Sequence, residues 1–421
     1  MMQCSRMAAA RSQLSRAFSS RTVSSPVVAV LFQDIDPPVI NGIRKPRKPG
    51  GYQDSGADIA YILQRLGVGV ITPSATPDVF SQEGWCFSDT EDGILSAVQR
   101  GATHLWANTI LFSSHPLQTS TELTPISDTL RVIGQPPRLV EDFDDKAYLN
   151  AKLRETGAFS LPQSWVVDAS ASPSRSRDVI KSVIDGVASA SYPVVGKPVR
   201  GRGSHGVKVC RSPEELRGHV ETLLLESPIV MLEEFLAGEE ATLTVFPPDA
   251  HHDHYWCLPP VTRFNHADGI APYNGVVAVT KNSRMVSPEE MAADPAYGEV
   301  MDQCAGVAEL IKTTAPIRID VRRRREGGAF VLFDINMKPV CFANYVWSST
   351  LQGEVWLCYM LTGDDQHQQN MTGPGRPGRE DQASLSAIAA SGVGWDYPTL
   401  LLKMLQCSRT LAELRNYFSP F

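Results

Sequence analysis

The first regular pattern in the chain is an apolar run followed by alternating helix-like and strand-like segments. Residues 27–32 are uniformly apolar, as expected of a buried strand, and residues 55–66 carry apolar side chains at helical spacing. Residues 68–71 form the next predicted strand, residues 92–99 a second helix, and residues 103–106 a further strand. This alternation predicts a parallel βαβ sheet.

Ligands of such sheets bind beyond the carboxyl ends of the strands. Residues 50–54 and Asn108 lie in connections there and are expected to line a substrate pocket, although an ordinary loop residue is the simpler interpretation of each one singly. Near the end of the chain, residues 397–418 place six apolar side chains at helical spacing, which predicts a buried helical segment: Leu400, Leu401, Met404, Leu405, Leu411 and Leu414.

A β-hairpin is predicted where residues 317–320 and 333–336 alternate apolar and polar side chains. Residues 322–325 are expected to form its exposed turn. The alternation places four polar side chains on one face: Arg318, Asp320, Asp334 and Asn336. Two carboxylates and an amide oxygen suit Mg²⁺ that carries substrate phosphates, and the arginine adds a charge for a phosphoryl group. A solvated hairpin edge is the alternative interpretation.

A glycine-rich loop between two predicted strands has the composition of a phosphate-binding loop. The strand that begins at residue 192 ends in Lys197, an ammonium group that is costly to bury without an anionic partner. The loop supplies glycines, which let backbone N–H groups approach a phosphate, and a serine hydroxyl: Gly201, Gly203, Ser204 and Gly206. A plain hairpin turn is the alternative.

A third element joins an apolar strand, from residue 229, to a second strand that begins at Glu240. Between them lie an acidic pair, a short apolar hinge and a glycine turn. The hinge backbone can offer N–H and C=O groups to an adenine edge, while Glu240 can accept hydrogen bonds from ribose hydroxyls. A simple hairpin with charged ends is the alternative.

These three elements, in this order, resemble the ATP-grasp superfamily over residues 141–350. Within it the chain resembles the carboxylate–amine ligases, among them D-alanine–D-alanine ligase and glycinamide ribonucleotide synthetase. The resemblance implies an α/β (α+β) chain in which an ATP-grasp fold follows a parallel βαβ substrate domain. It also implies ATP and Mg²⁺, with Mn²⁺ as a substitute, as the cofactors.

The resemblance implies a role for individual residues of this sequence. Lys146 and Lys197 would hold the ATP phosphates, under a loop that includes Gly201, Gly203, Ser204 and Gly206. Glu233 would contact adenine together with the backbone of three residues: Glu234, Phe235 and Leu236. Glu240 would bind the ribose.

The resemblance also implies the metal ligands and the catalytic cations. Asp320, Asp334 and Asn336 would ligate magnesium. Arg318 would stabilise the acyl-phosphate and the later tetrahedral intermediate, and Arg263 is a further candidate phosphate contact. The second metal position is usually glutamate in this superfamily, so Asp334, one methylene shorter, is less suited to bridge two ions.

The function expected from the resemblance is ATP-dependent ligation of a carboxylate to an amine through an acyl-phosphate, with release of ADP and phosphate. The acid is expected to be an amino acid or a similar small acid, and the partners are small molecules. A non-catalytic nucleotide-binding scaffold and an ATP-grasp kinase are the alternatives. Whether the chain forms a homodimer is left open.

Composition agrees with a multi-domain enzyme. The 421 residues exceed what one core usually supports, so two or three domains are expected. Together with the extent of the resemblance and the different composition of the first residues, this gives a leader or tail at 1–26, an N-terminal α/β substrate domain at 27–140, an ATP-grasp domain at 141–350 and a C-terminal loop and helical segment at 351–421. The net charge of −7 argues against a general nucleic-acid binder. The 8 cysteines show no CxxC pair, which favours a reduced compartment.

Two further features concern location. No apolar run approaches the roughly 20 residues that span a bilayer, so no membrane partner is expected. Residues 1–26 contain arginines and serines but no acid, which is typical of a mitochondrial transit peptide, with a disordered tail or a misassigned start codon as the alternatives. The mitochondrion and the cytoplasm are therefore the expected compartments.

Overall fold

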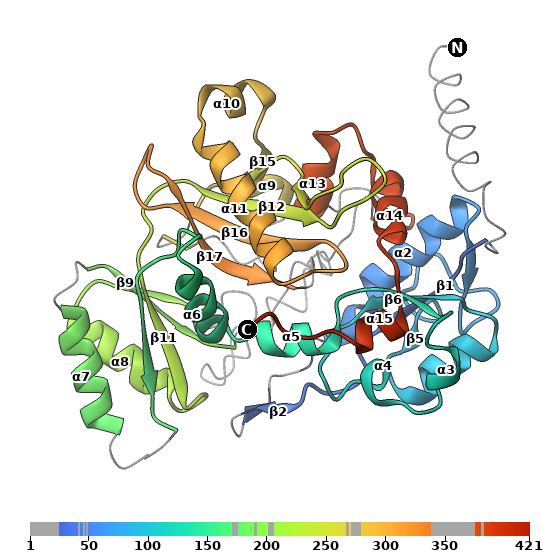
Figure 1. Cartoon of the computed structure of the whole chain (residues 1–421), viewed down its shortest axis with the longest axis horizontal. Coiled ribbons are helices and arrows are strands. Elements are labelled where there is room, and N and C mark those ends of the chain that lie inside the picture. The colour runs from blue at the N-terminus through green and yellow to red at the C-terminus, as the bar shows by residue number, and fades with distance from the viewer. Residues whose placement is uncertain are drawn as a thin grey trace, which may run out of the picture.

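The structure is a computed structural model of the chain (Figure 1). It describes residues 25–40, 43–44, 47, 49–170, 176–188, 192–200, 206–266, 269–270, 279–337, 375–379 and 383–421. Nearly all of the predicted leader lies outside these ranges. Among the described helices, none combines the length and the apolar character needed to cross a bilayer.

The first part of the chain forms a sheet in the order β18-β7-β6-β1-β4, with β5 also paired to β1. Strand β1 runs parallel to β4, β5 and β6, and β6 runs parallel to β7, so the predicted parallel βαβ sheet is confirmed. Its strands are β1 Val27–Phe32, β4 Gly69–Ile71, β5 Phe87–Ser88, β6 His104–Asn108, β7 Arg131–Ile133 and β18 Arg409–Thr410.

The connections of this sheet carry the predicted helices. Helices α2 and α3 begin within two residues of their expected starts, because the apolar spacing that predicts them is local. Thr90 caps α3 by accepting a hydrogen bond from Gly93 N. The helical elements are η1 Pro49–Tyr52, α2 Gln53–Arg65, α3 Glu91–Gln99, α4 Pro116–Thr119, η2 Thr124–Ile126 and α5 Pro137–Phe143, and a small ribbon pairs β2 Val39–Ile40 with β3 Ile43–Arg44.

A second, antiparallel sheet has the order β10-β9-β11-β8. Helices α7 and α8 pack on it, as Figure 1 shows. Their buried side chains and those of the sheet form a small apolar core. The strand that ends in a lysine and the strand that returns after the glycine-rich loop are confirmed as β9 and β10. The elements are α6 Lys146–Thr156, β8 Ser164–Asp168, α7 Ser176–Ala188, β9 Val194–Pro198, β10 Lys208–Cys210, α8 Pro213–Leu223 and β11 Ile229–Glu234.

A third sheet has the order β15-β14-β12-β16-β17, with β13 paired to β12. Helix α11 packs against β12, β16 and β17 (Figure 1). The elements are β12 Glu240–Phe246, β13 Trp256–Cys257, β14 Val261–Arg263, α9 Val279–Asn282, β15 Ser283–Met285, α10 Pro288–Ala293, α11 Ala296–Leu310, β16 Ile317–Arg323 and β17 Phe330–Asn336.

The connection between β11 and β12 passes from the second sheet to the third. The simple hairpin considered for this segment is therefore wrong, because its two strands pair with different neighbours. Gly238 N donates to Arg323 O at 3.0 Å, and Ala237 N donates to Arg324 O at 3.1 Å. A Cβ on Gly238 would meet the backbone oxygen of Arg325 at 2.6 Å, so only glycine allows this close approach.

The basic segment at residues 322–325 is only in part the exposed turn that was expected there. Arg322 and Arg323 belong to β16, and only Arg324 and Arg325 are exposed. Arg323 is buried because it pairs with Glu239 at 3.1 Å and Asp294 at 2.6 Å. Both acids are distant in sequence, so the local basic run gave no indication of them.

The C-terminal helices pack on two parts of the fold. Helices α13 Leu385–Ser391, α14 Tyr397–Gln406 and α15 Leu411–Arg415 follow one another, and β18 pairs with β7. Helix α14 contacts α2, and α13 contacts β12, β14 and β15. The side chains predicted to be buried by their helical spacing are buried: Leu400, Leu401, Met404, Leu405, Leu411 and Leu414.

Leu400 provides a test of this packing. Its side chain is fully buried, so Leu400→Ala should lower the free energy of unfolding by about 2–5 kcal/mol through lost burial and a cavity. Leu225→Ala is the control, because 87% of that leucine is exposed, and it should change stability by less than about 0.5 kcal/mol. Denaturant titration of both variants measures the difference, and equal midpoints would contradict the assignment of α14 to the core.

Candidate active site

The hairpin of β16 and β17 brings the predicted polar face together. Its register pairs Asp320 with Asp334 and Arg318 with Asn336, and the register shifts just after Asp320. Arg318 Nε lies 3.2 Å from Asp320 Oδ1, and Asn336 Nδ2 donates to Asp320 Oδ2 at 3.3 Å. Thr242 on β12 donates to Asp320 Oδ1 at 2.7 Å. The solvated hairpin edge is therefore wrong, since Arg318 and Asp320 are both buried.

Two lysines from other elements reach this hairpin. Lys146, the first residue of α6, places its Nζ 2.6 Å from Asp334 Oδ1. Lys197 on β9 places its Nζ 2.5 Å from Glu233 Oε2 and donates to Phe333 O at 3.2 Å. The expectation that a buried Lys197 needs an anionic partner is met by Glu233, which lies on the neighbouring strand β11.

The carboxylates of Asp334, which is partly buried, and Glu233, which is buried, respond oppositely to this environment. Burial raises the pKa of Asp334, but the charges of Lys146 and Lys197 outweigh it, so the net pKa is below the ordinary value. Burial raises the pKa of Glu233 as well, and there Lys197 offsets the shift only in part, so its net pKa is above the ordinary value. Asp334 therefore stays an anion at neutral pH, as a metal ligand must.

The donor set on the hairpin suits a hard divalent cation. Asp320 and Asp334 offer carboxylate oxygens, and Asn336 donates through its Nδ2, which leaves its amide oxygen as an acceptor. Within the described residues, no group of three or more His, Cys, Asp or Glu side chains is close enough to hold a metal. A cation bound here would therefore complete its shell with oxygens of water or substrate, as Mg²⁺ commonly does.

In the hinge at the end of β11, residues 234–236, the side chains contact other parts of the protein, so mainly backbone groups are available to a ligand. The Glu234 side chain pairs with Arg324 and accepts from Gln163 N at 3.1 Å. Leu236 is buried, and the ring of Phe235 lies 5.2 Å from the guanidinium carbon of Arg322. The Glu233 carboxylate faces Lys197, so its contact with adenine stays a prediction.

Glu240 begins β12 and lies among three basic side chains. His266 Nε2 is 2.9 Å from its Oε2, Arg263 Nη1 is 3.6 Å from Oε1, and Arg322 Nη1 is 3.7 Å from Oε2. Arg263 and Arg322 are Glu240's partners on the two neighbouring strands. The structure thus places Arg263 beside Glu240, and its proposed phosphate contact stays a prediction. The sequence analysis did not identify His266, since no motif marks it.

The glycine-rich loop is only partly described. Gly201, Gly203 and Ser204 lie outside the described residues. Gly206 has a φ of 69°, and a Cβ there would meet Leu223 at 2.9 Å and Pro198 at 3.1 Å. Its carbonyl oxygen is 3.0 Å from His219 Nε2. Gly206 therefore has a structural reason to be glycine in addition to any role at a phosphate.

Comparison with known proteins finds similarity across the part of the chain that contains most of this site. Residues 160–347 match the family model described as the D-ala D-ala ligase C-terminus. The D-alanine–D-alanine ligase of Aquifex aeolicus is 27% identical over 149 residues, which is 35% of this chain and 46% of the relative. That of Gloeobacter violaceus is 28% identical over 153 residues, 36% of this chain and 47% of the relative. The chain thus spans about half the length of these curated relatives.

Solved structures extend the likeness to most of the chain. The D-alanine–D-alanine ligase of Bacillus anthracis complexed with ATP superposes with a TM-score of 0.56 at 15% identity, over 93% of this chain and 98% of that one. The VanG D-Ala:D-Ser ligase of Enterococcus faecalis gives 0.54 at 12% identity, over 91% and 99%. The chain has the ATP-grasp fold. It resembles the carboxylate–amine ligases of that superfamily.

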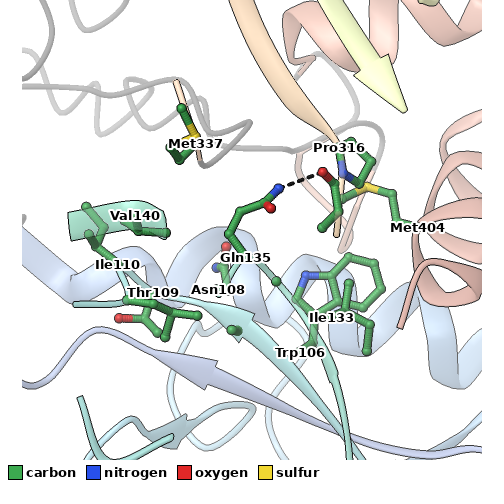
Figure 2. A pocket seen from close by; sticks show the side chains of 14 residues that line it. Trp106, Asn108, Thr109, Ile110, Ile133, Gln135, Val140, Pro316, Met337 and Met404 are labelled. Atoms are coloured by element: carbon green, nitrogen blue, oxygen red, sulfur yellow. Dashed lines mark hydrogen bonds between the residues drawn. The ribbon is translucent and has the colours of Figure 1, made fainter. Parts of the chain in front are cut away.

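A cavity of about 50 Å³ connects the first sheet of this ATP-grasp protein with the hairpin (Figure 2). Residues in and just after the ends of β6 and β7 line it, including Asn108, the last residue of β6, and Pro316 and Met337 line its other side. Gln135, after β7, links the first sheet to the segment before β16, since its Nε2 donates to Ala315 O at 2.6 Å and its Oε1 accepts from Thr314 N at 3.0 Å. The cavity borders the end of the polar face at which Arg318 pairs with Asn336, because Pro316 precedes β16 and Met337 follows Asn336.

Of the loop residues expected to line a pocket, Asn108 lines this cavity and residues 50–54 do not. Asn108 lines the cavity, but its Nδ2 donates to Tyr52 O and Ser55 Oγ, both at 2.9 Å, so it also anchors the start of α2. Asp54 is buried, and its carboxylate lies 3.6 Å from Arg379. The lining in Figure 2 does not include residues 50–54.

The lowered pKa of Asp334 predicts a pH dependence of stability. A carboxyl group whose folded pKa is below its ordinary 3.8 stabilises the fold above that value, and this stabilisation is lost as the pH falls through the lowered pKa. Between about pH 5 and pH 2, Asp334→Asn should therefore lose less stability than the wild type. Thermal unfolding across this range measures it. Asp128→Asn, at an exposed position, is the control, and parallel curves for all three proteins would contradict the prediction.

Proposed function

We propose that this chain is an ATP-dependent ligase that joins a carboxylate to an amine and releases ADP and phosphate. The observation that carries the proposal is the convergence of Lys146 and Lys197, from two different elements, on the hairpin that holds Asp320, Asp334 and Arg318. Cations for phosphates, oxygens for a metal and a further guanidinium for developing charge are the parts that phosphoryl transfer requires.

The reaction has two steps. A carboxylate oxygen of the acid attacks the γ-phosphorus of ATP, and ADP leaves with the electron pair of the broken bond. The amine nitrogen then attacks the acyl carbon, phosphate leaves, and the nitrogen loses its proton to give the amide. A free carboxylate reacts poorly with amines because its leaving oxygen is a strong base, and phosphorylation converts that oxygen into a good leaving group.

Each step assigns a task to named side chains. Lys146 and Lys197 bind the ATP phosphates, for which Lys146 exchanges Asp334 for a phosphate oxygen. Asp320, Asp334 and Asn336 hold Mg²⁺ or Mn²⁺, which neutralises phosphate charge when bound. Arg318 lies on the same face and stabilises the charge that develops on the acyl-phosphate and on the tetrahedral intermediate.

The nucleotide would lie between the second and third sheets. The hinge after β11 offers backbone groups to adenine, and Glu240 accepts from the ribose. Support comes from the Bacillus anthracis ligase, which has the same fold and was solved with ATP. The family model also covers this region, since it matches residues 160–347.

The acid and the amine are proposed to be an amino acid or a similar small acid and a small amine. The relatives that match in sequence are D-alanine–D-alanine ligases, which supports amino-acid substrates. The cavity next to the hairpin is small, at about 50 Å³, which supports a small substrate group there.

The test of this function is the dependence of ADP release on two substrates. Purified protein with ATP and Mg²⁺ is screened against pairs of amino acids, with ADP and phosphate as the readouts. A ligase should need both acid and amine, and hydroxylamine should replace the amine and trap the activated acid as a hydroxamate. Full-rate turnover with the acid alone and a stable phosphorylated product would indicate a kinase. ATP binding without ADP release under any mixture would indicate a scaffold.

Substitutions of Lys146 and Arg318 should distinguish a residue that binds ATP in the ground state from one that stabilises the transition state. Lys146→Met should weaken ATP binding about 10-fold to 100-fold, because it removes a charge-assisted phosphate contact. Arg318→Met should lower turnover about 10²-fold to 10³-fold with little change in ATP affinity, because its charge acts on the reacting groups.

Calorimetric ATP affinity and steady-state turnover measure the two effects. Lys152→Met is the matched control, since Lys152 lies on the same helix and pairs only with Glu155 among the described residues. An equal loss of ATP affinity in the Lys146 and Arg318 variants would show that the two roles are not separate.

A further inference from the structure

The Glu240 carboxylate has a defined hydrogen-bond partner and unused acceptor capacity. Burial raises its pKa, but the hydrogen bond from His266 and the charge of Arg263 outweigh it, so the net pKa is lowered and the group is ionised. An ionised carboxylate only accepts hydrogen bonds, so His266 Nε2 carries the proton in their 2.9 Å contact. This contact uses one of about four acceptor positions on the two oxygens.

The two arginines beside Glu240 differ from His266 in how they act. Their nitrogens lie at 3.6 Å and 3.7 Å from the carboxylate, so they contribute charge, whereas His266 fixes the position of Oε2. Arg322 also forms hydrogen bonds with the backbone, since its Nε donates to Gly238 O at 3.1 Å and its Nη1 donates to Gly269 O at 2.5 Å.

Backbone contacts near His266 hold this residue beside Glu240. Phe264 N donates to Asn282 O at 2.9 Å, which holds the chain at the end of β14. Asn265 then takes a φ of 58°, a left-handed conformation that asparagine tolerates better than most residues. Farther on, Gly269 packs against the ring of Phe235, so this segment covers the hinge.

We propose that His266 is a positioning residue for the nucleotide ribose: it holds Oε2 of Glu240 and thereby directs the carboxylate to accept from the ribose hydroxyls. The inference rests on the proposed function, in which Glu240 binds the ribose. His266 acts through Glu240, since it donates to the carboxylate and the carboxylate accepts from the sugar. Its side chain is the third member of the polar set around Glu240.

The test compares the affinity of the full chain, with Mg²⁺, for ATP and for 2′,3′-dideoxy-ATP by calorimetry. The wild type should bind ATP about 10-fold more tightly or better, because hydrogen bonds from the ribose to a charged acceptor are lost in the analogue. His266→Phe should reduce this ratio about threefold or more, since it uncouples two residues in direct contact. His266→Gln, which can still donate to the carboxylate, should restore most of it.

Matched controls separate positioning from general damage. His254→Phe removes another histidine–carboxylate contact, to Asp253 at 2.7 Å, but on an exposed loop outside the site, and should leave the ratio unchanged. His266→Asn provides a second loss variant if the phenylalanine variant does not fold. Glu240→Gln should lower the ratio by itself, and adding His266→Phe to it should cause no further loss.

Each failure has a distinct meaning. If the wild type did not bind ATP, the proposed function and this inference would both fall. If the wild type bound ATP and discriminated against the dideoxy analogue while His266→Phe kept the full ratio, only the role of His266 would be overturned. A ratio lost equally in His266→Phe and His266→Gln would also overturn it, because the donor would then not be what matters.

Discussion

The site depends on the pairing of buried charges between elements that lie far apart in the sequence. Lys146 and Lys197 are held by Asp334 and Glu233, and Lys197, which is buried, would be costly to bury without its acid. The Lys146 pair joins α6 to the hairpin of the third sheet, and Lys197 joins the second sheet to the same hairpin by donating to Phe333 O. Removing one member would leave a buried charge unpaired, so the geometry of the site and the docking of the sheets are determined together.

Much of the fold follows from local patterns in the sequence. The apolar run at β1, the helical spacing in α2 and the alternation in β16 and β17 each predicted the observed element, because periodicity is set by which face is buried. The polar face of the hairpin was predicted for the same reason. Alternation alone puts Arg318 and Asp320 on one side, and the register then brings Asn336 opposite Arg318.

What the sequence did not reveal is non-local. The passage of β11 and β12 into different sheets depends on their neighbours, and an apolar strand followed by a glycine turn looks the same in a hairpin. Arg323 appeared to be a turn residue because its acidic partners, Glu239 and Asp294, are distant in the chain. His266 was missed for a related reason, since its role is defined only by the carboxylate that folding brings to it.

The ion pairs also explain how a site can be assembled before its ligand arrives. Lys146 places a positive charge on Asp334, where the proposed magnesium would sit, and Lys197 places one on Glu233 beside the proposed phosphates. In the proposed function, the metal would replace an ammonium on Asp334, and phosphate oxygens would replace a carboxylate at Lys146. Because each incoming group would have the same sign of charge as the group that it replaces, the side chains are already oriented toward partners of that sign before the ligand binds.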